Sequence, residues 1–381
     1  MKLPIYLDYN ATTPVDERVL AEMLPFFSET FGNAASRSHL FGWNAQEAVE
    51  NAREQIASLL NATSKEIIFT SGATEANNLA IKGLFECNYP DKKHIITVKT
   101  EHKAVLDVCK HLEKLGAEIT YLQPDLSGKI NVQQVEEAIR DDTFLISIMY
   151  ANNEIGTVQP IKEIGELAQK YAILFHSDAT QAVGKIEVDV QLDMLDLLSL
   201  SGHKLYGPKG VGALFIRKNS KASKLITQMD GGKHERGFRS GTLNVPGIVG
   251  LGSACTLAQH NLLVENQRLI ILRNKLEQGL LKNISEVSVN GSIENRLPNV
   301  TNISFGKVDG ENLLMAFRDI AVSSGSACTS ASVEPSHVLK AIGLSDDLAY
   351  ASIRFSLGKY TTEAEIDFTI KYVKEVIESL R

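Results

Sequence analysis

Residues 199–210 read Ser-Leu-Ser-Gly-His-Lys-Leu-Tyr-Gly-Pro-Lys-Gly and give the clearest local signal of the fold. The apolar run at residues 195–200 predicts a buried strand, and the glycines and proline after it prevent a helix from following. Lys204 is therefore presented on a turn at a strand end. A lysine held there can lose its proton and act as an amine nucleophile, the starting condition for an imine with an aldehyde. A surface lysine in a loop is the alternative.

Outward from this stretch, apolar runs alternate with helical patterns. The predicted strands are 66–70, 94–99, 118–122, 143–151, 172–176, 196–201 and 211–217. The predicted helices are 47–60, 103–115, 132–140 and 161–171. Continuous apolar strands that alternate with helices favour an α/β fold with a mostly parallel sheet covered on both faces. In such sheets ligands bind beyond the strand ends.

The C-terminal third has a different pattern. It predicts helices at 264–282, 311–319, 334–342 and 363–380, and strands at 300–305 and 352–357. These elements favour a second, α+β domain, joined to the first through a hinge near residues 247–258.

Composition and charge narrow the class of protein. The chain has 381 residues, 44% of them hydrophobic and 22% charged, which is typical of a folded soluble protein. A net charge of -7 offers no basic face for nucleic acid. The first residues contain no long apolar segment, and no run of eighteen apolar residues follows, so we expect a cytoplasmic protein that binds no membrane. The four cysteines form no CxxC pair, which fits neither a disulfide framework nor a zinc site.

Two polar clusters that follow predicted strands indicate what Lys204 does. Residues 70–78 read Thr-Ser-Gly-Ala-Thr-Glu-Ala-Asn-Asn, a strand-to-helix turn on which a phosphate can bind at the helix N-terminus. An ordinary helix cap uses the same residue types. Asp178 follows a buried strand and can pair with a protonated ring nitrogen, while Gln181 can donate to a ring oxygen. A loop-capping aspartate is the alternative.

His102 and Asn153 follow two further predicted strands. His102 can stack on a planar cofactor or relay protons, and a satisfied interior histidine is the alternative. Asn153 can hold a ring hydroxyl or a substrate. Together with Lys204, these groups describe a pocket for pyridoxal 5'-phosphate, because that cofactor requires a Schiff-base lysine and an aspartate at its ring nitrogen.

Five motifs then connect the chain to a known family. They are residues 6–14 (Tyr-Leu-Asp-Tyr-Asn-Ala-Thr-Thr-Pro), 69–75 (Phe-Thr-Ser-Gly-Ala-Thr-Glu), 201–210, 234–242 (His-Glu-Arg-Gly-Phe-Arg-Ser-Gly-Thr) and 323–330 (Ser-Ser-Gly-Ser-Ala-Cys-Thr-Ser). Over essentially its whole length the chain resembles class V aminotransferase-fold enzymes, and among them the IscS/NifS-type cysteine desulfurases.

This resemblance implies a fold-type I pyridoxal-phosphate transferase that forms a homodimer. Its large domain, residues 13–257, would hold a mostly parallel seven-stranded sheet. Its smaller α+β domain would combine residues 1–12 with residues 258–381 and carry the loop of the catalytic cysteine.

The resemblance also implies roles for single residues. It assigns the phosphate or ring oxygen to Thr74, Gln181, Ser201 and His203, the pyridine nitrogen to Asp178 and ring stacking to His102. Ala73 would also contact the cofactor, and Asn153 would contact the cofactor and the substrate. Thr242 would reach the phosphate of the neighbouring subunit, so that dimerisation completes each site.

Cys328 indicates the reaction. It lies among glycine and small hydroxyl residues, whereas Cys87, Cys109 and Cys255 lie in helical patterns, where a cysteine is usually a small buried hydrophobic residue. The thiolate is the reactive form of cysteine, and a loop cysteine that can enter an electropositive pocket is a credible nucleophile. We therefore predict that L-cysteine is converted to L-alanine while its sulfur passes to Cys328 as a persulfide.

In this hypothesis Arg354 holds the substrate carboxylate by a bidentate contact. Lys204 forms the Schiff base with the cofactor and then serves as acid and base, and His102 relays a proton. The persulfide would supply an iron–sulfur scaffold protein and other sulfur acceptors in thio-cofactor or tRNA thiolation pathways. We predict no metal site, apart from a transient contact of Cys328 with a nascent iron–sulfur cluster.

Two other classes of function stay open. One is a related enzyme, a selenocysteine lyase or an aminotransferase; the other is a non-catalytic sulfur-assembly subunit, against which the presence of both Lys204 and Cys328 argues. Two features also differ from the family pattern. Residues 231–233 read Gly-Gly-Lys where related chains commonly have three glycines. Housekeeping members continue past the last helix with a tail that docks the scaffold, whereas this sequence ends at Arg381, which leaves catalysis intact and scaffold docking open.

Overall fold

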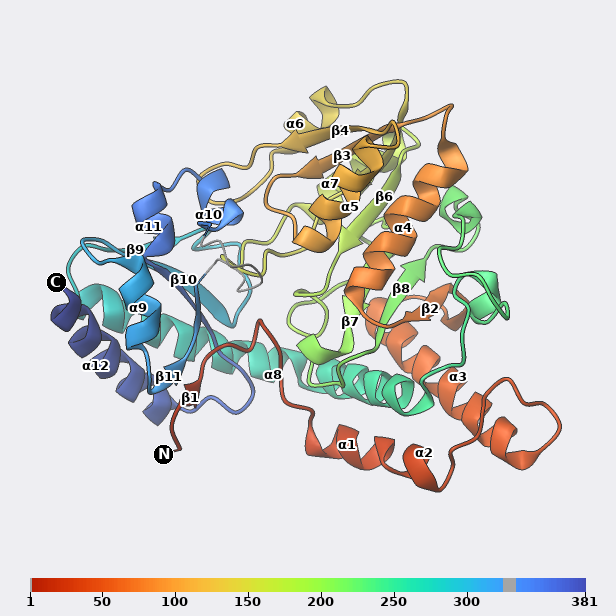
Figure 1. Cartoon of the computed structure of the whole chain (residues 1–381), viewed down its shortest axis with the longest axis horizontal. Coiled ribbons are helices and arrows are strands. Elements are labelled where there is room, and N and C mark those ends of the chain that lie inside the picture. The colour runs from red at the N-terminus through yellow and green to blue at the C-terminus, as the bar shows by residue number, and fades with distance from the viewer. Residues whose placement is uncertain (1, 325–333) are drawn as a thin grey trace.

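The computed structural model describes residues 2–324 and 334–381. Its largest sheet has seven strands in the order β2-β8-β7-β6-β5-β3-β4 (Figure 1). These strands are β2 (Ile67–Thr70), β3 (His94–Val98), β4 (Glu118–Leu122), β5 (Thr143–Ser147), β6 (Leu174–Asp178), β7 (Leu197–Ser201) and β8 (Gly212–Ile216). Strand β8 is antiparallel to both of its neighbours, and the other pairings are parallel. The prediction of a mostly parallel seven-stranded sheet is confirmed.

Helices cover both faces of this sheet. They are α3 (Leu40–Leu60), α7 (Ile161–Lys170) and α8 (Val245–Asn283) on one face, α4 (Ala73–Asn88) and α5 (Lys103–Glu113) on the other, with α1 (Glu17–Met23), α2 (Pro25–Ser28) and α6 (Val132–Glu137) nearby. Successive side chains of a strand point to opposite faces. In β3, Ile95 packs in the apolar cluster under α4 and α5, and Ile96 packs in the cluster under α3, α7 and α8. Burial on both faces explains the continuous apolar runs in the sequence.

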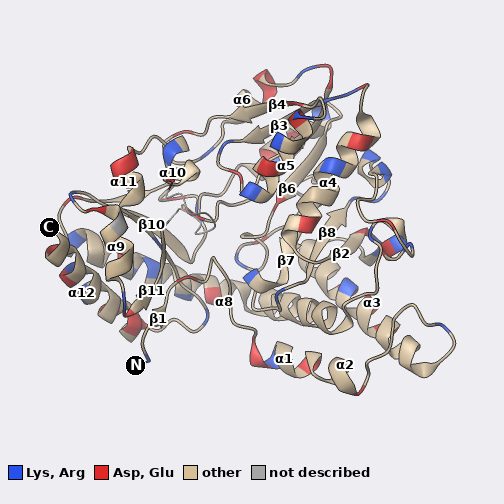
Figure 2. Cartoon of the chain, viewed as in Figure 1, with Lys and Arg blue, Asp and Glu red and all other residues tan. Residues whose placement is uncertain are grey.

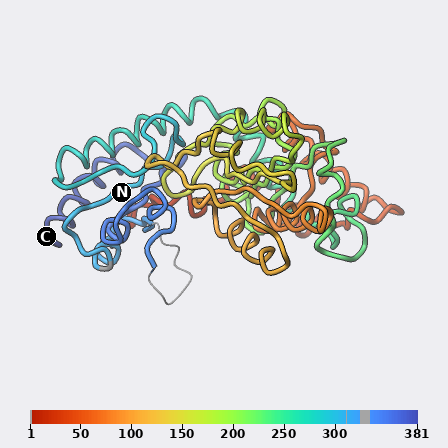
Figure 3. Tube along the Cα trace, turned by 90° about the horizontal axis from the view of Figure 1, so that it is seen from above, coloured from red at the N-terminus to blue at the C-terminus, as the bar shows by residue number. Residues whose placement is uncertain are grey.

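Helix α8 corrects two expectations. It runs without interruption from Val245 to Asn283, along one side of the molecule (Figure 3), so the predicted hinge near 247–258 and the predicted helix start at 264 are wrong. Its small residues serve close packing instead. A Cβ atom on Gly252 would lie 2.6 Å from Cα of Ala52 in α3. From the sequence alone, a series of small residues is equally consistent with a hinge and with close packing between two helices.

The C-terminal part forms a second sheet, with the antiparallel order β12-β13-β10-β9. Its elements are β9 (Val287–Asn290), β10 (Val300–Phe305), β12 (Ser323–Ser324), β13 (Ser352–Ser356), α9 (Gly310–Ala316), α10 (His337–Ala341), α11 (Asp346–Tyr350) and α12 (Glu363–Leu380). The strands predicted at 300–305 and 352–357 are confirmed, whereas β9 and α11 were not predicted. Both ends of the chain lie beside this sheet (Figure 1).

The N-terminal segment packs with the C-terminal part. Strand β1 (Ile5–Tyr6) pairs with β11 (Ile320–Ala321), and Asp8 forms a β-bridge with Ser356 of β13. Leu7 belongs to the apolar cluster of the second sheet. This packing agrees with the placement of residues 1–12 in the smaller domain, and the domain boundaries themselves stay a prediction.

Lysine and arginine residues are interspersed with aspartate and glutamate along the described chain (Figure 2). Among the described residues, no helix is both long and apolar enough to span a membrane.

Candidate active site

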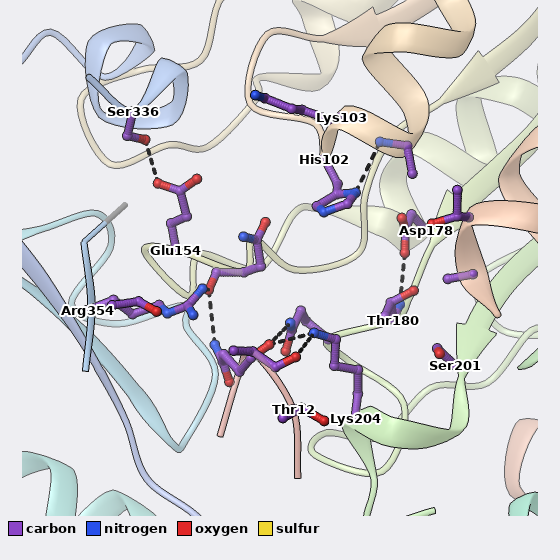
Figure 4. A pocket seen from close by; sticks show the side chains of 18 of the residues that line it. Thr12, His102, Lys103, Glu154, Asp178, Thr180, Ser201, Lys204, Ser336 and Arg354 are labelled. Atoms are coloured by element: carbon purple, nitrogen blue, oxygen red, sulfur yellow. Dashed lines mark hydrogen bonds between the residues drawn. The ribbon is translucent and has the colours of Figure 1, made fainter. Parts of the chain in front are cut away.

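The carboxyl ends of the large sheet open into a pocket of about 1540 Å³, which β13 and α10 of the second sheet region also border (Figure 4). Ten predicted site residues line this pocket: Ala73, Thr74, His102, Asn153, Asp178, Gln181, Ser201, His203, Lys204 and Arg354. Parallel strands place their carboxyl ends at one edge of the sheet, which explains why residues so distant in the sequence meet here.

Two predicted site residues are not in this group. Thr242 is exposed and does not line the pocket of its own chain, so its predicted contact with a neighbouring subunit stays a prediction. Cys328 lies outside the described residues. Ser324 and Glu334, the described residues on either side of that segment, both line the pocket.

Lys204 ends the short 3-10 helix Gly202–Lys204 that follows β7. Its Nζ donates to the backbone oxygens of Asn10, at 2.7 Å, and Ala11, at 2.6 Å. Burial and, second, the positive charge of Arg354 lower the pKa of Lys204 to about 8, although Asp8 and Asp178 act in the opposite direction. A neutral amine is the nucleophilic form of lysine, and this pKa populates it near neutral pH.

Asp178 is the last residue of β6 and is buried. Its Oδ2 accepts a hydrogen bond from Asn77 Nδ2 at 2.7 Å, and its Oδ1 accepts one from the backbone N–H of Thr180 at 3.0 Å. The Asp178 carboxylate therefore caps the loop that follows β6, and it also faces the pocket. Burial lowers the pKa of His176, two residues earlier, to about 4 despite the opposing charge of Asp178. The neutral imidazole leaves Asp178 available to a cation in the pocket.

The first turn of α4 borders the pocket with free backbone donors. The helix begins after Gly72, which has a φ of 152°, and no described side chain caps it. The N–H groups of Ala73 and Thr74 at such a terminus bind anions. A Cβ atom on Gly212 would lie 2.7 Å from Cα of Gly72, so the turn is held tightly against β8. This end of the pocket fits a phosphate group.

Ser201 and His203 also line the pocket. His203 Nδ1 pairs with Thr12 Oγ1 at 3.1 Å. Burial, followed by the charges of Lys204, Lys209 and Lys185, lowers the pKa of His203 to about 4. His203 is therefore a neutral hydrogen-bonding group at physiological pH.

His102 is the N-cap residue of α5, and its Nδ1 accepts a hydrogen bond from the backbone N–H of Ala104 at 3.1 Å. The ring is exposed and points into the pocket (Figure 4), so it is not a satisfied interior histidine. Because Nδ1 is an acceptor here, a neutral ring carries its proton on Nε2. One face of the ring remains available for stacking.

Arg354, in β13, approaches the pocket from the second sheet. It donates to Asp8 Oδ1 at 2.7 Å and to the backbone oxygen of Asn153 at 3.0 Å. Its buried Nε has no hydrogen-bond partner among the described residues, and neither has Oγ1 of Thr180, which also lines the pocket. Buried polar atoms are nearly always satisfied in folded proteins, so both atoms favour a polar ligand in this pocket.

The sequence analysis did not select three residues that shape the site. Asn10 is buried beneath Lys204, and Lys185 contacts Gln181. Glu154 lines the pocket, where burial raises its pKa to about 7, and its Oε2 accepts from Ser336 Oγ at 2.5 Å. Asn10 lies in the motif at residues 6–14, and that motif could have identified it. For Lys185 the only sequence feature that pointed to the site is its spacing of four residues from Gln181.

The remaining cysteines agree only partly with expectation. Cys109 and Cys255 are buried, and burial raises the pKa of each thiol to about 12. Cys87 is exposed, so its expected burial is wrong. It lies in the last turn of α4, on the side that faces solvent.

The pocket fits pyridoxal phosphate on the observations above. It has an uncapped helix terminus for a phosphate, a buried carboxylate for a ring nitrogen, an exposed imidazole for stacking and a lysine of lowered pKa. Such features are typical of α/β enzymes in which a lysine holds an aldehyde cofactor.

Comparison with known proteins gives the family. The family model described as aminotransferase class-V matches residues 5–368, and the chain belongs to this family, among its IscS/NifS-type members. Cysteine desulfurase IscS of Escherichia coli strain E24377A is 57% identical over 383 residues, and that of Anaeromyxobacter sp. strain K is 55% identical over 381 residues. Each alignment covers 100% of this chain and 94% of the relative.

Solved structures agree with this placement. A NifS-like protein superposes with a TM-score of 0.92 at 39% identity, covering 99% of this chain and 100% of its own. A structure described as SspA in complex with cysteine has a TM-score of 0.83 at 44% identity, covering 94% of this chain and 100% of its own.

Proposed function

We propose that this protein is a pyridoxal-phosphate-dependent cysteine desulfurase that converts L-cysteine to L-alanine and transfers the sulfur to Cys328 as a persulfide. The observation that carries the proposal is Lys204, a lysine of lowered pKa in one pocket with Asp178 and the free terminus of α4. Relatives that are 55% and 57% identical over the whole chain and described as cysteine desulfurases support it.

The residues that would hold the cofactor follow from the geometry. The N–H groups of Ala73 and Thr74, with Ser201 and His203, would hold the phosphate, and Asp178 would keep the ring nitrogen protonated. His102 would stack on the ring, while Gln181 would donate to the ring oxygen. The bound cofactor supplies an electron sink for the electrons released at the substrate Cα.

Four side chains would act on the substrate. Arg354, which lines the pocket from β13, binds the carboxylate. Lys204 accepts the Cα proton and later returns a proton to the product, with His102 as a relay. The Cys328 thiolate attacks the substrate sulfur, so that an S–S bond forms while the C–S bond breaks. L-cysteine and one thiol thus give L-alanine and one persulfide, and no external oxidant or reductant is needed.

Partner proteins also belong to the proposal. Large apolar residues are exposed at the junction of α1 and α2, on α2, in the following loop and at the start of α3, and such a patch is typical of an interface. They are Leu24, Phe27, Phe31, Leu40, Phe41 and Trp43. A homodimer formed through this region would let Thr242 approach a neighbouring pocket. The persulfide would then pass to an iron–sulfur scaffold protein or another sulfur acceptor.

The function is tested by incubating the purified protein with pyridoxal phosphate and L-cysteine. We expect alanine to be released and the peptide that contains Cys328 to gain the mass of one sulfur atom. L-serine, which has no sulfur, serves as the matched control and should give neither product. Formation of a keto acid without a mass gain would instead indicate an aminotransferase.

The lowered pKa of Lys204 predicts how cofactor uptake depends on pH. Attack on the cofactor aldehyde requires the neutral amine, whose fraction increases up to a pKa of about 8. The rate of uptake by the cofactor-free protein should therefore rise with pH and become constant above about 8. Stopped-flow absorbance measures this rate, and a rate that still increases tenfold from pH 9 to about 10 would indicate an ordinary lysine.

A further inference from the structure

Lys185 is a second amine beside the pocket, and the proposed reaction does not use it. It follows β6 and lies four residues after Gln181. Its Nζ donates to Gln181 Oε1 at 2.5 Å and to Asn10 Oδ1 at 3.3 Å. The charges that act on it come from Lys204 and Arg354, and both are positive. The lysine is therefore held by neutral amide oxygens rather than by a carboxylate.

Asn10 connects Lys185 to Lys204. The backbone oxygen of Asn10 accepts from Lys204 Nζ at 2.7 Å and from Gln181 Nε2 at 2.9 Å, while its side-chain Oδ1 accepts from Lys185. Asn10 is 1% exposed, and Asn299 Nδ2 donates to the same Oδ1 at 3.0 Å. These hydrogen bonds join Asn10, Gln181 and Lys185 in one network, and the same network holds the Lys204 amine.

The contacts with Lys185 and Asn10 together determine which way the Gln181 amide faces. Because the Lys185 N–H points at Oε1 and the Asn10 backbone oxygen accepts from Nε2, the oxygen faces Lys185 and the NH2 group faces Asn10 and the pocket. One N–H of Gln181 goes to Asn10, which leaves the second for a ligand oxygen. Without Lys185 the Gln181 oxygen loses its donor and only the Asn10 contact orients the amide, so the second N–H is held less firmly toward the ligand.

We propose that Lys185 is a positioning residue for the active site, which acts through Asn10 and Gln181 to hold the Lys204 amine and the Gln181 donor in place. This inference rests on the proposed function, because the oxygen that Gln181 would contact belongs to the cofactor.

The charged groups that the structure describes around Lys185 offer it no carboxylate partner. Burial, followed by the positive charges of Lys204 and Arg354, places the pKa of Lys185 well below its usual value. Lys204 in turn faces Arg354, Asp8 and Asp178. His203 faces Lys185, Lys204 and Lys209, and its own pKa is low. The two amide oxygens of Gln181 and Asn10 are therefore what hold the Lys185 amine in place.

The test compares Lys185→Met, which removes the amine, with Lys185→Arg, which adds a permanent charge. Lys162→Met, on the exposed side of α7, is the matched control. In the full-length cofactor-free protein, the pH dependence of Lys204 acetylation, read by peptide mass spectrometry, reports the pKa of Lys204. In the loaded enzyme, the pH titration of the visible absorption band and the separate values of kcat and KM report the site geometry.

We expect Lys185→Met to raise the Lys204 midpoint, because loosening the network around Asn10 admits water to the Lys204 amine. Lys185→Met should also shift the titration of the visible band and lower kcat by about 10- to 100-fold with little change in KM. Lys185→Arg should lower kcat as well, because a planar guanidinium does not reproduce both contacts of the compact amine. Lys162→Met should change none of these values.

Two results would overturn the inference. A Lys204 midpoint, kcat and absorption titration that all stay at the parent values in Lys185→Met would remove the positioning role. If circular dichroism shows that Lys185→Met does not fold, a parent-like kcat and absorption titration in Lys185→Arg decide against it. Absence of a visible band in the parent protein would contradict the proposed function instead, while the acetylation measurement would still report on Lys185.

Discussion

Replacement of Lys204 with alanine should abolish the visible absorption band that forms when the protein is mixed with pyridoxal phosphate. The Lys204 amine is the pocket nucleophile whose pKa is lowered, to about 8, and it is held by two carbonyl oxygens at 2.7 and 2.6 Å. Lys204→Ala removes both the covalent attachment of the cofactor and the group that accepts the Cα proton. Loss of proton transfer alone costs about 10²- to 10⁴-fold in rate.

The measurement is an absorption spectrum of parent and variant after gel filtration, together with alanine release from L-cysteine. Lys162→Ala serves as the control, because that lysine is exposed and distant from the pocket lining. The phosphate contacts of α4 do not involve Lys204, so the variant should still bind the cofactor reversibly. A variant that keeps both the band and the turnover would contradict the role of Lys204.

The residues that the sequence identified from local pattern alone share one feature. Asp178 and Lys204 each lie within three residues of the end of a predicted buried strand, 172–176 and 196–201, and such strands in alternation with helices favour a parallel sheet. In a parallel sheet the carboxyl ends of the strands lie at the same edge. The residues that follow those ends are therefore brought together, and the position of the pocket can be predicted from the order of strands and turns. Arg354 could not be found in this way, because the second sheet reaches the pocket through antiparallel pairing that no local pattern indicates.

The residues that sequence analysis missed act through tertiary contacts. Asn10 makes hydrogen bonds to Gln181, Lys185 and Lys204, which lie more than 170 residues further along the chain. Nothing in the sequence near Lys185 distinguishes it from an exposed lysine. Similarly, the small residues in α8 favoured a hinge because composition does not show that α3 packs against them.

Replacement of Cys328 with alanine should stop sulfur transfer and leave cofactor binding intact. The cofactor contacts come from the ends of the large sheet, whereas Cys328 belongs to the segment between Ser324 and Glu334, two residues that line the pocket. Without the thiolate no group accepts the substrate sulfur, so the C–S bond of L-cysteine is not cleaved by the proposed mechanism. We expect alanine release from L-cysteine to fall on the order of 10³-fold or more.

Two readouts separate this loss from damage to the fold. The visible band and its pH titration should match those of the parent protein, and the mass gain on the peptide that contains residue 328 should disappear. Cys87→Ala is the matched control, because Cys87 is also a free thiol and is exposed, on α4. If the Cys328 variant released alanine at the parent rate while Cys87→Ala lost activity, the sulfur acceptor would be Cys87 and not Cys328. Parent-like rates in both variants would instead mean that sulfur leaves without a protein thiol, which would favour a lyase over a persulfide-forming desulfurase.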